Sequence, residues 1–165
     1  MRATTMRLFS NVTDAAGAIG VFLGFYFLAG HDDNRGKLAL TALVIGFTVV
    51  MGSLSWIRHF LLWKQDSKAL GVESTEPFFH WEVGFANGAF AIAGLLAIVL
   101  DWGVQALAVA VLAYAAYLLQ ASALHCYRYI TGQSRSPRRL WGSIVGLSAL
   151  CLMAIYIAFA AVAAG

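Results

Sequence analysis

Charged residues are scarce in this chain. Only 12% of its 165 residues are Asp, Glu, Lys or Arg, whereas a soluble domain carries roughly 25%. Hydrophobic residues make up 61%, and the mean hydropathy is +0.76. A soluble fold of this length has no way to cover so much apolar surface, so the composition excludes an ordinary soluble enzyme and predicts a protein embedded in lipid.

Cysteine and proline are also rare, with two residues of each. Cys126 and Cys151 are far apart in the sequence and form neither a CxxC motif nor a disulfide framework, so we interpret them as small buried hydrophobic residues. Pro77 and Pro137 each precede an apolar segment. Proline is favoured in the first turn of a helix, so both positions indicate helix starts.

Long apolar segments account for most of the chain. Five windows reach the length of about 17 residues that a membrane-spanning helix needs, and only short connections separate them. The predicted spans cover residues 12–30, 38–57, 83–100, 104–124 and 140–162, each to within a few residues. The predicted fold class is therefore all-α: a single transmembrane bundle of five helices over residues 1–165, with the third helix central.

The basic residues are distributed unevenly between the two sides of this bundle. Nine lie on the side of the N-terminus: Arg2, Arg7, Arg58, Lys64, Lys68, Arg128, Arg135, Arg138 and Arg139. Only Arg35 and Lys37 lie on the other side. Since cytoplasmic segments carry the excess of Lys and Arg, the N-terminus is predicted to be cytoplasmic and the C-terminus to lie outside. This placement explains the net charge of +3 without nucleic-acid binding.

Small residues recur at helical spacing in the first and last spans. Gly17, Gly20 and Gly24 share one side of the first span, and Gly142 and Gly146 form a GxxxG motif in the fifth. Such faces let helix backbones approach closely. They predict close packing, either within the bundle or against a second copy or a partner in a membrane complex.

Polar side chains interrupt three of the spans at helical spacing. The three aligned sets are Thr41, Thr48, Gly52, Ser55 and His59 in the second span, His80, Gly84, Asn87, Ala91 and Gly94 in the third, and Tyr114, Tyr117, Ala121 and His125 in the fourth. Polar groups are costly in lipid, so these faces are predicted to point into the bundle. Residues 60–70, which mix Leu and Trp with Lys and Asp, predict a short helix on the membrane surface.

These polar groups define a predicted ligand or ion site in the cytoplasmic half of the bundle, formed by Glu82, Asn87, His59, His125 and Tyr117. A transport-type protein would use such a site. For a metal ion, the candidate ligands are His59, His80, Glu82 and His125, and haem would use His59 and His125 as axial ligands. A third alternative is an accessory or assembly subunit without chemistry of its own. No HExxH, HxxxH or ExxH motif is present, which disfavours a metal site, and an enzyme remains a less favoured alternative.

The segment EVGFANG, residues 82–88, resembles the opening of a helix in a family of small, uncharacterised bacterial inner-membrane proteins. Its continuation GAFAIAGLL, residues 88–96, is similar to the DoxX-like family of small multi-helix membrane proteins. The resemblance implies a bacterial inner-membrane bundle, with Glu82 and Asn87 as the positions to test.

Overall fold

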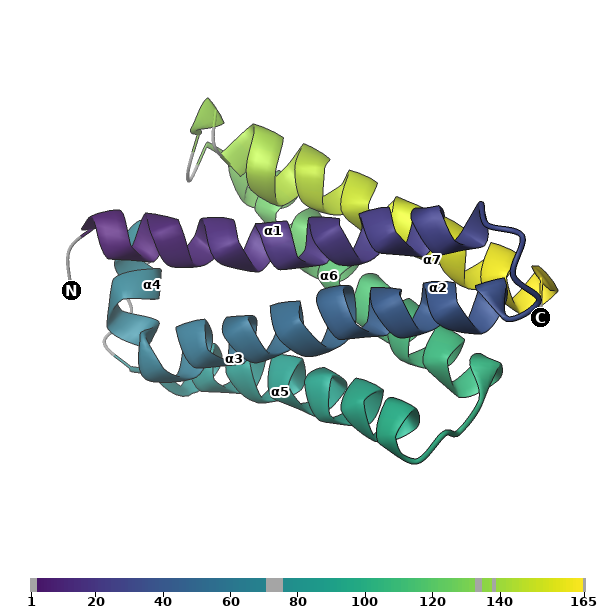
Figure 1. Ribbon diagram of the computed structural model, residues 1–165. Helices are drawn as coiled ribbons and strands as arrows, with labels where there is room; N and C mark the ends of the chain where they lie inside the picture. The colour runs from purple at the N-terminus through teal and green to yellow at the C-terminus, as the bar shows by residue number, and fades with distance from the viewer. Residues whose placement is uncertain (1–2, 71–75, 133–134, 138, 165) are drawn as a thin grey trace.

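The computed structural model describes residues 3–70, 76–132, 135–137 and 139–164, and all regular structure within them is helical (Figure 1). Five helical stretches are long and apolar enough to cross a membrane: Leu8–Leu28, Arg35–Leu61, Phe78–Val99, Val104–Ile130 and Arg139–Ala164. The predicted all-α bundle of five membrane-spanning helices is confirmed for the described residues. The chain is a multi-pass membrane protein.

The elements follow one another as an up-and-down bundle. In order they are α1 (Ala3–Leu28), α2 (Arg35–Leu43), the π-helical segment η1 (Val44–Val50), α3 (Met51–Leu61), α4 (Trp63–Leu70), α5 (Phe78–Val99), α6 (Val104–Ile130), the π-helical segment η2 (Arg139–Gly146) and α7 (Leu147–Ala164). Helix α5 begins at Phe78, before the apolar window at 83, and α6 continues to Ile130. Backbone hydrogen bonding therefore extends these helices past their most apolar part, and His80 and His125 both lie on helices.

The second span, formed by α2, η1 and α3, is the most buried of the five. Half of its most apolar window is buried, compared with 28% for α5. Helix α5 packs mainly against the second span and α6, while Glu82, Ala89 and Ala93 on its other side are exposed. The expectation that the third helix is central is thus wrong, because small residues on a helix face permit close packing but do not require a neighbour.

Helices α1 and α2–η1 cross at a pair of glycines. A Cβ atom placed on Gly20 would lie 2.8 Å from the backbone nitrogen of Phe47 and 2.9 Å from Cα of Gly46. Gly17 and Gly24 are also buried on this side of α1. The predicted packing face of the first span is confirmed, and it is the absence of side chains that lets the second span lie so deep in the bundle.

The GxxxG motif of the last span does not pack against the described residues of the bundle. Gly142 and Gly146 of the GxxxG motif are both exposed, and nothing lies within 4 Å of a Cβ placed on Gly142. The buried side of α7 consists of Cys151, Ala154, Ile157, Ala158 and Ala161. The last span therefore packs into the core through the apolar face of α7, and the face with the two glycines is exposed on the outside of the bundle.

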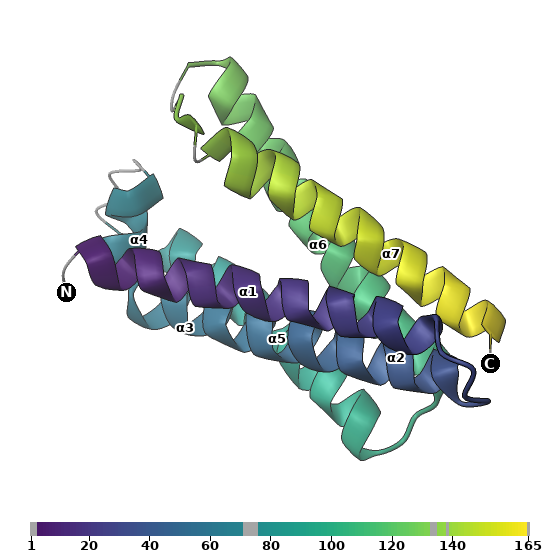
Figure 2. The same cartoon turned by 45° about the horizontal axis from the view of Figure 1, so that its top comes forward.

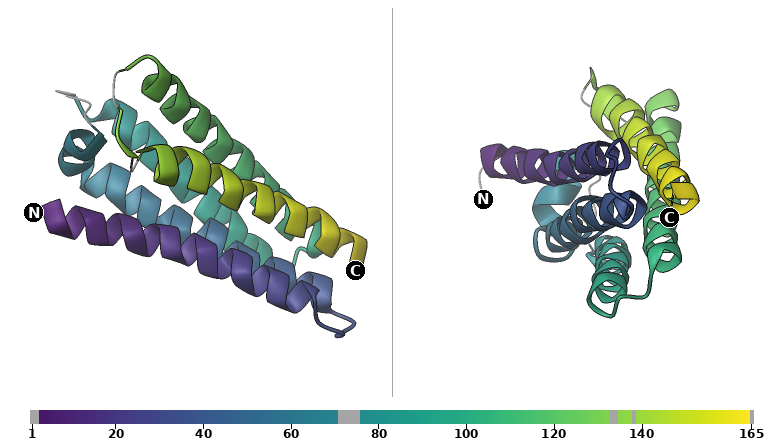
Figure 3. Two further views of the ribbon diagram at one scale, coloured as in Figure 1. Left: turned by 90° about the horizontal axis from the view of Figure 1, so that it is seen from above. Right: turned by 45° about the vertical axis from the view of Figure 1, so that its right-hand side comes forward.

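One end of the bundle carries the start of α1, helix α4 and the connection from α6 to η2, and we call it the basic end (Figure 1). The connections from α1 to α2 and from α5 to α6, and the end of α7, lie at the opposite end. At the basic end, α6 and η2 lean away from α3 and α4 (Figures 2 and 3). The end of α3 and the start of α5 therefore lie next to α4, with which both are in contact.

We expect Gly20→Ala to destabilise the bundle, because its Cβ would meet backbone atoms that can move only if the two helices separate. Overpacking of this kind costs about 1–3 kcal/mol. Thermal unfolding of the purified protein in detergent, followed by circular dichroism, measures the loss. Gly142→Ala is the matched control and should leave the unfolding temperature unchanged or raise it; equal behaviour of the two variants would contradict the proposed role of the crossing.

Candidate functional site

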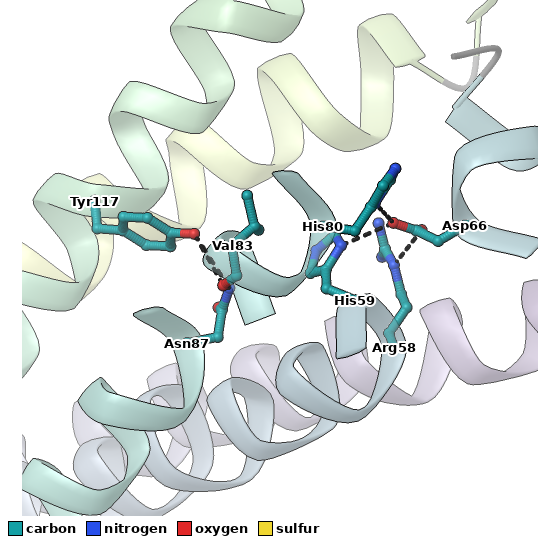
Figure 4. A network of polar contacts seen from close by, with 7 residues as sticks. All are labelled: Arg58, His59, Asp66, His80, Val83, Asn87 and Tyr117. Carbon is teal, nitrogen blue, oxygen red and sulfur yellow. Dashed lines mark hydrogen bonds and ion pairs between the residues drawn. The ribbon is translucent and has the colours of Figure 1, made fainter. Parts of the chain in front are cut away.

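Three ionisable side chains meet at the basic end, each from a different helix (Figure 4). His59 is in the last turn of α3, Asp66 is on α4 and His80 is in the first turn of α5. Asp66 Oδ2 lies 2.8 Å from His59 Nδ1 and 3.4 Å from His80 Nδ1. One potential ligand atom of each residue lies within 4.8 Å of those of the other two. We call these three residues the His–Asp–His cluster.

Local structure explains how the cluster forms. Helix α3 ends at Leu61, and Leu62 leaves the helical region with φ −109° and ψ 23°, so that α4 starts in a new direction. A Cβ on Gly84 would lie 3.3 Å from the backbone nitrogen of Phe60 and 3.5 Å from Cβ of His59. The bare backbone at Gly84 thus brings α5 against the end of α3 and places the His59 and His80 rings 6.2 Å apart, centre to centre.

Asp66 is the charged centre of the cluster and is 1% exposed. Arg58 Nε donates a hydrogen bond of 2.7 Å to Asp66 Oδ1, which leaves Oδ2 to face the two histidines. Burial by itself would raise the pKa of Asp66. The close contact with His59 and the positive charge of Arg58 outweigh burial and lower this pKa from 3.8 to about 2, so the carboxylate is ionised.

Several buried polar atoms in the cluster have no hydrogen-bond partner among the described residues. They are His59 Nδ1, Asp66 Oδ2 and both ring nitrogens of His80. The approach of His59 to Asp66 is an ion-pair distance, but it lacks the alignment of a hydrogen bond. His80 is only 1% exposed, and an unsatisfied buried polar group costs about 1–3 kcal/mol. The cluster therefore has binding capacity that the protein itself does not use.

A second polar group lies farther along α5. Tyr114 donates to Asn87 Oδ1 at 2.9 Å, and Asn87 Nδ2 donates to the carbonyl of Val83 at 2.7 Å and to Tyr117 Oη at 3.2 Å. Tyr117 in turn donates to the Val83 carbonyl at 3.4 Å. These polar groups form hydrogen bonds with one another, so the network holds α5 against α6. A ligand could bind there only by displacing these internal hydrogen bonds.

The predicted site residues thus fall into separate groups. His59 and His80 meet in the His–Asp–His cluster, and Asn87 and Tyr117 meet in the amide network. Glu82 is exposed on the other side of α5, because it is two residues from His80 and helical spacing turns it away. His125 is half-buried on α6, outside the cluster, with its Nδ1 unpartnered among the described residues. Of the four predicted metal ligands, the structure therefore brings together His59 and His80, and Glu82 and His125 lie apart from them.

Sequence reasoning missed Asp66, which it placed in a surface helix. A signal was present, since Asp66 follows Trp63 by three residues and so shares its side of α4, while Lys64 and Lys68 share another. Lys64 and Lys68 are exposed, and Asp66 is buried. An acidic residue on the aromatic side of a short helix indicates that this side faces protein. Tyr114 was assigned to the inward stripe, but its bond to Asn87 was not foreseen.

Comparison with known proteins gives a family but no biochemical role. The model of a family of unknown function, DUF6790, matches residues 11–165. The chain belongs to this family. An uncharacterised family agrees with the resemblance of residues 82–88, whereas no link between this DUF6790 chain and the DoxX-like family is shown. No curated protein and no solved structure matches the chain.

The lowered pKa of Asp66 predicts how stability depends on pH. Because the pKa is about 2 in the folded protein and 3.8 ordinarily, the ionised carboxylate stabilises the fold fully above about pH 4, and this stabilisation is lost as the pH falls toward 2. Asp66→Asn should therefore unfold at a lower temperature than the wild type at about pH 6, with a difference that shrinks toward about pH 3. Asp33→Asn, an exposed substitution at the opposite end, should show no such trend. A difference that is constant with pH would contradict this role of Asp66.

Proposed function

We propose that this protein binds a small cation in the His–Asp–His cluster, as part of a transport-type function. The observation that carries the proposal is the buried Asp66 Oδ2, which lies within 3.4 Å of two imidazole nitrogens and has no hydrogen-bond partner among the described residues. An ionised carboxylate in such a place attracts positive charge, and an imidazole nitrogen can donate an electron pair to a cation. Arg58 occupies only the other oxygen.

Buried polar groups continue from the cluster into the membrane span. Ser55 is buried one turn before His59, and Thr48 is fully buried in η1 with a hydroxyl that has no partner among the described residues. Thr48 precedes His59 by eleven positions along the helix, or about 16 Å, roughly half of a hydrocarbon core. π-helical segments such as η1 often occur at functional sites. This line of polar groups supports a path for an ion toward the middle of the membrane.

We further propose that the basic end faces the cytoplasm, in a bacterial inner membrane. The excess of Lys and Arg at this end of the bundle supports this orientation. A reporter that is active only in the cytoplasm should work when it is fused to the N-terminus, and one that is active only outside should work at the C-terminus. The reverse pattern would invert the proposed topology and place the His–Asp–His cluster outside.

Cation binding can be tested through thermal stability. We expect at least one class of cation, among Na⁺, K⁺, Mg²⁺ and transition-metal ions, to raise the unfolding temperature of the chelator-treated protein, because a ligand that binds only the folded state stabilises it. Asp66→Asn should abolish this increase, and Asp33→Asn should retain it. Vesicles that contain the wild-type protein should take up the stabilising ion, and vesicles that contain Asp66→Asn should not. This result would show transport as well as binding. The proposal fails if no cation raises the unfolding temperature or if Asp66→Asn responds like the wild type.

One structural feature favours the accessory-subunit alternative. The outward face of η2 and α7 carries Gly142 and Gly146 and continues through the exposed Met153 and Tyr156. A helix of another chain could approach this backbone closely. Disulfide crosslinking in membranes through a cysteine introduced by Gly142→Cys, with Cys126→Ser removing the half-buried native thiol, tests for such a neighbour. Absence of any crosslinked species would exclude a second copy of this chain as that neighbour.

A further inference from the structure

We infer that the cation is a transition-metal dication, held by His59, Asp66 and His80. This inference rests on the proposed cation site and specifies what occupies it. Two imidazole nitrogens and one carboxylate oxygen form a donor set that suits zinc, iron, cobalt and similar ions. Mg²⁺ and Ca²⁺ instead prefer shells of oxygen ligands, whereas two of the three donors in the cluster are imidazole nitrogens.

The two donor separations that involve Asp66 match a shared ion. Ligand atoms held at about 2.1 Å from one metal lie about 3.0 Å apart at a right angle and about 3.4 Å apart at the tetrahedral angle. The separations of Asp66 Oδ2 from the two imidazole Nδ1 atoms, 2.8 Å and 3.4 Å, span this range. Neither separation has hydrogen-bond alignment, so the atoms are close without being bonded to each other.

His80 gives the second, independent observation. Its ring is 1% exposed, and neither nitrogen has a hydrogen-bond partner among the described residues. Aromatic rings pack around it: Phe79 lies 5.7 Å away and Trp63 lies 6.4 Å away, centre to centre. Neither ring makes a hydrogen bond to His80. An imidazole enclosed in this way and 3.4 Å from a carboxylate oxygen gains a partner when a metal ion binds between them.

Arg58 fixes how Asp66 can act as a ligand. Its hydrogen bond to Oδ1 prevents both carboxylate oxygens from reaching the same ion, so Asp66 contributes Oδ2 alone. The guanidinium also opposes a second positive charge nearby. Its side chain is 21% exposed and already paired, so water and the carboxylate weaken that repulsion. Three protein ligands leave at least one coordination position open, which an anion or water can fill and thereby offset the charge.

The test uses Co²⁺ as a spectroscopic probe of the full chain, purified in detergent without a histidine tag and treated with a chelator. We expect one equivalent of Co²⁺ to bind and to give visible d–d absorption typical of mixed nitrogen and oxygen ligands. Asp66→Asn and His80→Ala should each weaken binding at least about tenfold. His31→Ala, which changes an exposed histidine at the opposite end, should bind like the wild type.

Rescue separates ligation from a structural role. His80→Cys should restore Co²⁺ binding and add a sulfur-to-cobalt charge-transfer band, which a folding defect would not produce. Absence of Co²⁺ and Zn²⁺ binding in the wild type, or unchanged binding in Asp66→Asn and in His80→Ala, would overturn the inference. If Na⁺ or K⁺ then stabilises the wild type but not Asp66→Asn, the proposed cation site stands without a transition metal. If no cation does so, both fail together.

Discussion

The carboxylate of Asp66 is the interaction on which the basic end of this bundle depends. It is buried where α3, α4 and α5 meet, and it contacts a residue of each neighbouring span through Arg58, His59 and His80. A buried charge without partners would be strongly unfavourable, so these contacts are a condition for α4 to pack against the bundle at all. A short polar helix that would otherwise lie on the lipid surface is thereby attached to the protein.

The glycines determine how close the other helices come. Gly20 and Gly46 let the first two spans touch through their backbones, and Gly84 does the same for α3 and α5. Without a strong hydrophobic driving force between helices in lipid, such close contact is a main source of stability. The polar side chains are then held at defined positions by packing, and the amide network of Asn87 with Tyr114 and Tyr117 fixes α6 against α5.

Hydropathy was sufficient to predict the five spans, and helical spacing was sufficient to group His80, Gly84 and Asn87 on one face of α5, but it did not tell that this face is buried and the opposite one is not. Neither pattern could show which helices each face of α5 would contact. Glu82 appeared as good a ligand as His80 because both precede the same span, yet only one points inward. Asp66 was missed because its burial depends on the turn at Leu62, a tertiary feature that composition does not encode. Likewise, the GxxxG motif in η2 predicted close packing, but the sequence could not show which helix, if any, its glycines would contact.

The two polar groups differ in how much of the chain each one needs. His59, Asp66 and His80 all belong to residues 59–80, at the tip of the hairpin that α3 and α5 form around α4. The network of Asn87 requires Tyr114 and Tyr117 from the following helix. During synthesis from the N-terminus, every member of the His–Asp–His cluster is therefore present before the ribosome reaches α6. The cluster therefore needs no residue of α6, η2 or α7 to supply its three side chains.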